Sequence, residues 1–298
     1  MGIPSFLAAI YEAIIACLQF LLGRQLFRQP AISSPQSIIG DYDGAHPIAV
    51  IIPCYKEGNT VAKTISHLFD SATLSPTLGE PSVTVVQAGN NEHQDDDDAL
   101  TRMSKTHPRL TIHNFAYASR GEQQNFGARS TTEPILLFLH ADTLLPAGWD
   151  SSILHQLNRE RARQRPTIGA FTLSLPEPIS WSLRIMLWGA NVRARYGGLP
   201  YGDQAYFVRR DTFEAVGGFP SVPIMEDLGL LKNIGQARGQ VIVDASPVLT
   251  SPRRWNKNGV VWNTILNQVF IFAWKCGATP EMIYKWYYGR EPQRPRQS

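Results

Sequence analysis

Short apolar runs, each separated from the next by a helix-like segment, constrain the fold of this chain more than any other feature. The first run, Ile48–Ile52, is stopped by Pro53, and others follow at Val83–Val86, Leu110–Ile112 and Ile135–Leu139. A strand that is apolar at every position is typically buried on both faces of a sheet. Such strands alternating with helices predict an α/β fold with a doubly wound, mostly parallel sheet flanked by helices.

Helical spacing fills the gaps between these runs and continues to the C-terminus. Helices are expected at 58–69, 99–107, 123–130, 153–165, 181–196, 211–216, 228–234 and 260–274, with a final helix after Thr279-Pro280. Further strands are expected at 168–173, 206–208 and 241–243, and the charged helix at 153–165 is expected to be a solvated face. Ligands bind such sheets beyond the carboxyl ends of the strands, where Pro53, Gln87 and His140 stand.

Size and composition fit one large domain, expected at 48–290, with one half at 48–148, a second half at 149–290 and a frayed tail at 291–298. The chain has 298 residues, 43% of them hydrophobic and 18% charged, which suffices for a sizeable core. A net charge of +3 without a long Lys/Arg run argues against nucleic acid. Three scattered cysteines indicate a reducing, cytoplasmic compartment.

The N-terminal residues 1–28 are expected to form an amphipathic helix, followed by a linker at 29–47 rich in Pro, Ser, Gly and Asp. Its apolar positions are Phe6, Leu7, Ile10, Ile14, Leu18, Leu21 and Leu22. Glu12 is costly in a spanning helix, and the arginines follow the apolar stretch, unlike those of a signal peptide. The alternatives are packing on the protein, peripheral contact of residues 3–22 with the inner face of a membrane, or spanning it.

Four polar motifs combine acids with arginines in a fixed order. They are His140-Ala141-Asp142, Tyr201-Gly202-Asp203-Gln204, Met225-Glu226-Asp227 and Arg253-Arg254-Trp255. Carboxylates bind hard divalent cations or accept protons, and guanidinium groups pair with phosphate oxygens. The convergence of these motifs predicts a site for a phosphorylated, metal-associated substrate.

This order of motifs resembles the family 2 glycosyltransferases, which have the GT-A fold, from about residue 48 to about residue 288. It looks closest to the bacterial subgroup named for arsenosugar biosynthesis, the arsenosugar-biosynthesis glycosyltransferases. The resemblance also rests on Ile52-Pro53-Cys54-Tyr55-Lys56-Glu57 and on Arg120-Gly121 through Asn125 and Gly127. It implies inverting transfer of a sugar from a nucleotide-diphosphate donor to an acceptor hydroxyl, assisted by Mg or Mn. It also implies that residues 48–148 form the nucleotide-sugar-binding half and residues 149–290 the acceptor half.

The resemblance assigns the general base to Asp227, with Glu226 beside it, and metal binding to Asp142. Alternatively, the two adjacent acids form a helix start favoured by the macrodipole, and Asp142 forms a turn. His140 replaces the first acid of the family's DxD motif. His140 could bind a metal ion, and an imidazole suits Mn better than Mg. Alternatively, it could form a hydrogen bond with the donor, or it could be only a structural histidine at a strand end.

Further donor and acceptor contacts are carried over from the family. They are Glu57, Arg120, Asn125, Asp203, Arg253, Arg254 and Trp255. The resemblance places the first three at the nucleotide donor, Asp203 at the acceptor or sugar, and the last three in a loop that folds over the diphosphate or acceptor. Alternatively, each of these residues could have only a structural role, in a loop, in a helix cap or on the surface.

The second strand departs from the family pattern, because Gln87 stands where a base-recognising acid is usual. An amide still forms hydrogen bonds, so contact with the nucleobase survives but the donor nucleotide stays open. Two alternatives accompany this departure. One is a membrane-surface enzyme with a lipid-linked acceptor, favoured by the aromatic and basic stretch 274–290, and the other is a non-catalytic nucleotide-sugar-binding protein.

Overall fold

The computed structural model describes residues 46–292 apart from 56, 58, 90–93, 162–164 and 253–258. The predicted N-terminal helix, most of the predicted linker, Arg253, Arg254, Trp255 and the tail from 293 onward therefore lie outside the described residues. His46 and Pro47, at the end of the predicted linker, are buried. Buried residues thus precede the expected domain start at Ile48, and the expected domain bounds stay a prediction.

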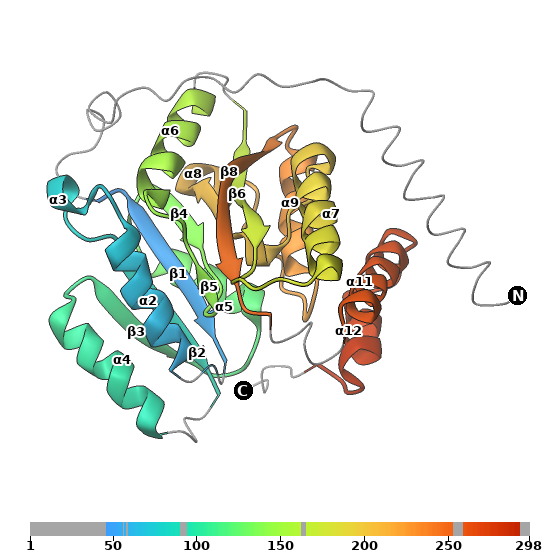
Figure 1. Ribbon diagram of the computed structural model, residues 1–298, viewed down its shortest axis with the longest axis horizontal. Coiled ribbons are helices and arrows are strands. Elements are labelled where there is room, and N and C mark those ends of the chain that lie inside the picture. Colours follow the sequence, from blue (N-terminus) through green and yellow to red (C-terminus); the bar gives the residue numbers. More distant parts are fainter. Residues whose placement is uncertain are drawn as a thin grey trace, which may run out of the picture. The chain divides into compact units, whose positions relative to one another are not determined.

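An eight-stranded sheet forms the centre of the described domain (Figure 1). Its spatial order is β3 (Leu110–Phe115), β2 (Ser82–Ala88), β1 (Ile48–Cys54), β4 (Ile135–Phe138), β7 (Tyr206–Arg209), β6 (Thr167–Ser174), β8 (Gln240–Thr250) and β5 (Thr143–Leu144). Neighbours among β3, β2, β1 and β4 pair in parallel, as do β6 and β8. β7 and β5 pair antiparallel with their neighbours, so the predicted mostly parallel sheet is confirmed with two antiparallel additions.

Helices cover both faces of this sheet (Figure 1). One core includes residues of α2 (Thr60–Ser71), α4 (Gln94–Thr106), α6 (Trp149–Arg161) and α7 (Trp181–Gly197). The other includes residues of α5 (Arg120–Arg129), α8 (Arg210–Ala215) and α9 (Glu226–Gln236). The remaining elements are α3 (Ser75–Leu78), the 3-10 turn η3 (Gly202–Gln204), α11 (Val260–Lys275) and α12 (Pro280–Tyr288). Within the described part of the chain, no helix combines the length and apolarity needed to cross a bilayer.

The strand β1 connects the two cores. Ile48, Val50 and Ile52 pack in the core with α2, whereas Ala49 and Ile51 pack in the core with α9. Successive side chains of a strand point to opposite faces, so a continuous apolar run serves both cores. Polar side chains that bind a ligand are therefore restricted to the ends of such strands.

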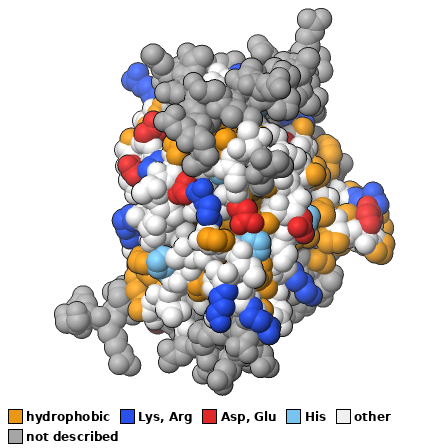
Figure 2. Space-filling view, turned by 90° about the vertical axis from the view of Figure 1, so that its left-hand side faces the viewer, with side chains coloured by type: hydrophobic (Ala, Val, Ile, Leu, Met, Phe, Trp, Pro, Cys, Tyr) orange, Lys and Arg blue, Asp and Glu red, His pale blue; other side chains and the backbone are white. Residues whose placement is uncertain are grey.

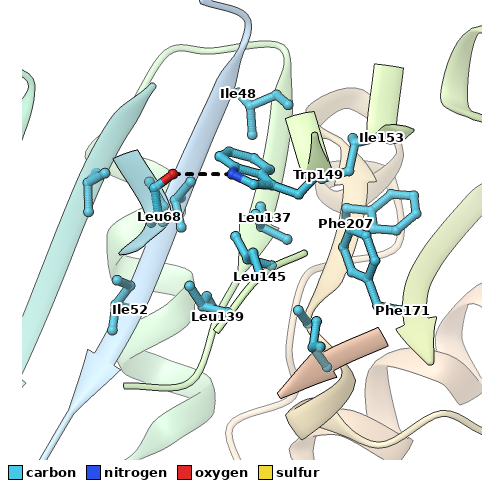
Figure 3. Packing of buried hydrophobic residues seen from close by; sticks show 14 of the residues in the cluster. Ile48, Ile52, Leu68, Leu137, Leu139, Leu145, Trp149, Ile153, Phe171 and Phe207 are labelled. Atoms are coloured by element: carbon cyan, nitrogen blue, oxygen red, sulfur yellow. Dashed lines mark hydrogen bonds between the residues drawn. The ribbon is translucent and has the colours of Figure 1, made fainter. Parts of the chain in front are cut away.

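The helix α6 is anchored by a fully buried tryptophan. Trp149 lies beside Ile48 and Leu137, and its Nε1 donates to the carbonyl oxygen of Leu68 at 3.3 Å (Figure 3). Ile153, Leu154 and Leu157 are buried on the same helix. The expectation that this segment is a solvated face is wrong for its inner side, because these apolar residues face the sheet.

The helix α5 is held at the carboxyl ends of β1 and β2 by a buried amide. Gln123 Nε2 donates to the carbonyl oxygens of Cys54 at 3.1 Å and Val86 at 2.7 Å. The helix α5 and the strand β1 pack closely, since a Cβ atom at Gly127 would lie 2.5 Å from Ile51 Cγ2. These contacts fix the first turn of α5 beside the strand ends.

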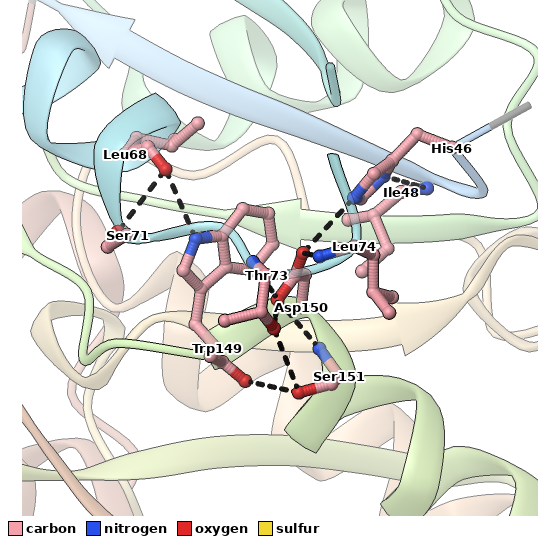
Figure 4. A network of polar contacts seen from close by, with 10 residues as sticks. His46, Ile48, Leu68, Ser71, Thr73, Leu74, Trp149, Asp150 and Ser151 are labelled. Carbon is pink, nitrogen blue, oxygen red and sulfur yellow. Dashed lines mark hydrogen bonds and ion pairs between the residues drawn. The ribbon is translucent and has the colours of Figure 1, made fainter. Parts of the chain in front are cut away.

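A buried carboxylate ties α6 to the segment after α2 and to the start of β1 (Figure 4). Asp150 accepts hydrogen bonds from the backbone nitrogens of Thr73 at 3.0 Å, Leu74 at 2.7 Å and Ser151 at 2.8 Å. His46 Nε2 lies 3.5 Å from Asp150 Oδ2, while His46 Nδ1 accepts from the Ile48 backbone. Burial raises the pKa of Asp150, but its hydrogen bonds outweigh burial and hold the pKa below the ordinary value.

We expect Asp150→Asn to lower the free energy of unfolding by about 2–4 kcal/mol, because an amide donor would face backbone donors in a buried site. Urea denaturation at neutral pH measures this loss, and Asp70→Asn on the exposed side of α2 is the matched control. Because the folded pKa of Asp150 is lowered, its stabilisation is complete above the unfolded pKa of about 4 and disappears as the pH falls through the folded pKa. Equal stability of the two variants would contradict this role of Asp150.

Candidate functional site

A cavity of about 410 Å³ opens beyond the carboxyl ends of β1 and β4. This volume lies in the range of small-ligand pockets. Eight of the predicted site residues line it: Pro53, Glu57, Arg120, His140, Asp142, Asp203, Glu226 and Asp227. Asp142 and Asp227 are both partly exposed, so neither acid is sealed in the core.

The turn η3 lies beside both His140 and Asp227, which line the cavity. The backbone nitrogen of Gly202 donates to Asp227 Oδ2 at 3.0 Å. A Cβ atom at Gly202 would lie 3.2 Å from His140 Nε2 and 3.7 Å from Asp227 Oδ2. His140 and Asp227 therefore approach one glycine, and a larger residue there would fill the space between them.

A buried glutamine positions this turn. Gln204 Nε2 donates to the carbonyl oxygen of Phe171 at 2.8 Å, and its Oε1 accepts from the Tyr201 backbone nitrogen at 3.1 Å. The Tyr201 ring, which lines the cavity, is covered by the Arg193 guanidinium at 3.3 Å from the ring centroid. In the Gly-Asp-Gln motif, Gln204 thus supports the fold, whereas Asp203 lines the cavity.

The acidic pair occupies the first turn of α9, which begins after a strained residue. Met225 has a left-handed φ of 66°, a conformation that side chains other than glycine seldom adopt. Such strain persists where the surrounding structure enforces it and is common at functional sites. The unusual backbone directs Glu226 and Asp227 toward the cavity that both line.

The two acids have different surroundings. Glu226 is buried, and its Oε1 accepts from Arg120 Nη1 at 3.1 Å. Burial raises the pKa of Glu226, the Arg120 guanidinium lowers it in part, and the Asp227 carboxylate raises it again. Asp227 is more exposed and accepts one backbone hydrogen bond on each oxygen, from Gly202 and Leu228. Each of its oxygens keeps a lone pair for another donor.

The Arg-Gly motif owes its glycine to close packing. A Cβ atom at Gly121 would lie 3.1 Å from Glu226 Cβ and 3.2 Å from the Pro220 carbonyl oxygen. The absence of a side chain lets the start of α5 approach the start of α9. This approach is what allows Arg120 to reach Glu226.

Asn125 lies outside the cavity lining, so its predicted contact with the donor stays a prediction. Its amide donates to the Phe219 carbonyl oxygen at 2.8 Å and accepts from the Phe219 nitrogen at 3.0 Å. Its part in the motif is therefore to hold the segment that precedes α9. Gln87 ends β2 but is also absent from the cavity lining, so its contact with a nucleobase stays a prediction.

The far wall of the cavity comes from helices that the sequence motifs did not indicate. Asn267, Phe270 and Ile271 of α11 and Tyr287 and Tyr288 of α12 line it. The Phe270 and Tyr287 rings meet edge to face, with centroids 5.6 Å apart. The aromatic content of α12 is visible in the sequence, but its place at the cavity depends on tertiary packing. Thr250 and Ser251 also line the cavity, whereas Arg253, Arg254 and Trp255 lie outside the described residues.

The donor set at the end of β4 fits a divalent cation. Asp142 supplies a carboxylate and His140 an imidazole, a combination suited to Mn²⁺. Among the residues that the structure describes, no cluster of three His, Cys, Asp or Glu side chains could hold a metal ion. Mg²⁺ commonly binds through one or two carboxylates plus substrate phosphates, so a two-residue site is chemically sufficient for a phosphate-bound cation.

Solved glycosyltransferases share this fold. The mannosyltransferase PcManGT from Pyrobaculum calidifontis, solved with GDP-Man and Mn²⁺, matches with a TM-score of 0.60 and 18% identity over 95% of this chain and 79% of that chain. GalNAc-T7, solved with UDP, GalNAc and Mn²⁺, matches with a TM-score of 0.54 and 12% identity over 68% of this chain and 43% of that chain. The sequence matches no protein-family model and no curated protein. The predicted GT-A type of fold is confirmed.

We expect Gly202→Ala to weaken the binding of a nucleoside diphosphate with Mn²⁺, because the added methyl group would enter the space between His140 and Asp227. Calorimetric titration with UDP and GDP measures this affinity. Gly189→Ala on α7 is the control, since nothing lies within 4 Å of the added atom there. Unchanged nucleotide affinity in Gly202→Ala would remove this part of the cavity from the ligand site.

Proposed function

We propose that this protein is an inverting, family 2 glycosyltransferase that moves a sugar from a nucleotide-diphosphate donor to an acceptor hydroxyl. The single observation that carries the proposal is the approach of His140 and Asp227 to Gly202 inside a cavity that Asp142 also lines. A metal-binding side and a proton-accepting side thus share one ligand-sized space. The fold, which the two glycosyltransferases above share, supports the same conclusion.

Asp227 is the proposed general base. An acceptor hydroxyl oxygen attacks the anomeric carbon, its proton passes to the Asp227 carboxylate, and the bond from that carbon to the diphosphate oxygen breaks with inversion. An alcohol ionises far above neutral pH, so it needs a base within hydrogen-bond reach. The backbone donors of Gly202 and Leu228 hold the Asp227 carboxylate in position for this role.

Arg120 and Glu226 are proposed to serve the leaving group. Negative charge develops on the diphosphate as the bond breaks, and a fixed cation lowers the energy of that state. Glu226 holds Arg120 at the cavity through the 3.1 Å contact and therefore acts as a positioning residue. Mg²⁺ or Mn²⁺ bound by Asp142 and His140 would supply further charge neutralisation when present.

The remaining residues divide between donor and acceptor. Pro53 and Glu57, at the end of β1, are proposed to face the nucleotide. Asp203 and the aromatic wall of α11 and α12 are proposed to face the transferred sugar or the acceptor. Arg253, Arg254 and Trp255 keep the role that the resemblance implies, in the loop over the diphosphate or acceptor.

We expect Asp227→Asn to reduce sugar transfer by about 10²–10⁴-fold, because the amide cannot accept the proton. A nearly unchanged affinity for the nucleoside diphosphate should accompany this loss. Transfer from a panel of nucleotide sugars measures the first effect and calorimetry the second, with Asp211→Asn, exposed on α8, as the control. Wild-type activity in Asp227→Asn would exclude Asp227 as the base. If the wild-type protein binds nucleotide sugars but transfers no sugar, it would instead be a nucleotide-sugar-binding protein.

We expect Asp142→Asn to weaken Mn²⁺-dependent nucleotide binding, because the variant loses the carboxylate charge that attracts the cation. Titration with the nucleoside diphosphate in the presence of Mn²⁺ and then of EDTA separates the metal-dependent part. The variant should resemble wild type only after EDTA treatment. A full response to Mn²⁺ in the variant would show that the metal is held elsewhere.

A further inference from the structure

The outer face of α7 exposes large apolar side chains beside two arginines, Arg184 and Arg195. Leu183, Leu187, Ala190 and Ala194 are the buried residues of this helix. On the opposite side, Trp181, Ile185 and Trp188 are 76%, 59% and 58% exposed. Their spacing of four and three residues places them on one stripe of the helix.

The two C-terminal helices show the same feature. Trp262 and Phe272 of α11 are 61% and 69% exposed, and Trp286 of α12 is 54% exposed. α11 packs against both α7 and α12, and the three helices lie together on the right in Figure 1. Four of the seven tryptophans of the chain are thus exposed on this helical group. We call Trp181, Ile185, Trp188, Trp262, Phe272 and Trp286 the aromatic face.

The charges of these helices are mostly positive. α7, α11 and α12 together carry five Lys or Arg residues and one Glu, whereas the whole chain has a net charge of only +3. Arg184 and Lys285 form ion pairs with the flanking Glu177 and Glu291, and Arg193 lies over the Tyr201 ring. The two remaining cations of the group are Arg195 and Lys275. By contrast, Lys and Arg are interspersed with Asp and Glu on the opposite side of the domain, shown in Figure 2.

We propose that the aromatic face is a docking surface for an anionic lipid membrane. Tryptophan rings favour the boundary between headgroups and hydrocarbon, and cations beside them attract acidic headgroups. Helices that lie in this boundary combine aromatic and aliphatic residues with Lys or Arg, as α7, α11 and α12 do. The binding is peripheral and does not depend on the chemistry proposed for the cavity.

The proposed surface adjoins the cavity through shared helices. α11 and α12 contribute Phe270 and Tyr287 to the cavity wall and Phe272 and Trp286 to the aromatic face. Tyr288 lines the cavity and is itself 47% exposed. A membrane held by the aromatic face would therefore lie next to helices that line the candidate site.

Flotation of the full chain with vesicles tests the proposal. Wild-type protein should float with vesicles of phosphatidylcholine mixed equally with phosphatidylglycerol, and less with pure phosphatidylcholine or in high salt. The variant Trp181→Gln, Ile185→Gln, Trp188→Gln should bind the mixed vesicles roughly tenfold more weakly. Lys63→Gln with Asp70→Asn, on exposed positions of α2, is the control and should bind like wild type.

Two further measurements keep the result interpretable. Quenching of wild-type tryptophan fluorescence by brominated lipid should occur and needs no variant, and its absence would overturn the proposal. A second full-chain variant, Phe6→Gln, Ile10→Gln, Ile14→Gln, changes the predicted N-terminal helix. Vesicle binding lost in this variant but kept in a folded α7 variant would assign the membrane contact to residues 3–22 and overturn the proposal. Wild-type protein that self-associates and ignores vesicles would identify the face as an interface between copies.

Discussion

The burial of β1 on both faces is the constraint on which the rest of this structure depends. Because Ile48 to Ile52 serve two cores, this central strand has no free face on which polar groups could bind a ligand. Binding is left to the strand ends, where the apolar pattern stops at Pro53 and at His140. The helices that start beside those ends, α5 and α9, then complete the cavity with Arg120, Glu226 and Asp227.

The residue pattern alone was sufficient to predict those features that depend on local or periodic sequence, such as strands and helices. The strands and helices appear in the expected order, because buried strands and amphipathic helices leave distinct periodicities. The sequence motifs also identified both sides of the cavity, since strand ends and helix starts are marked by changes in polarity. The family resemblance added the expectation that these motifs would meet in space.

What the sequence could not show depends on contacts between distant segments. Asn125 sits in a motif with Arg120, yet its amide is used by the backbone of Phe219, 94 residues away. His46 looked like part of a linker, but it is buried against Asp150 across 104 residues. The aromatic wall from Phe270 and Tyr287 was missed for the same reason. Periodicity predicts which face of a helix is apolar, but it does not predict which element packs against that face.

The left-handed backbone of Met225 has a consequence for how this chain can change. A glycine at that position would adopt the same backbone at lower conformational energy. The native methionine therefore marks a place where stability has been given up, as is common where a protein's activity depends on a strained site. Replacing Met225 with glycine would therefore be a simple way to raise the thermal stability of this protein. The same change would risk making the orientation of Glu226 and Asp227 less fixed.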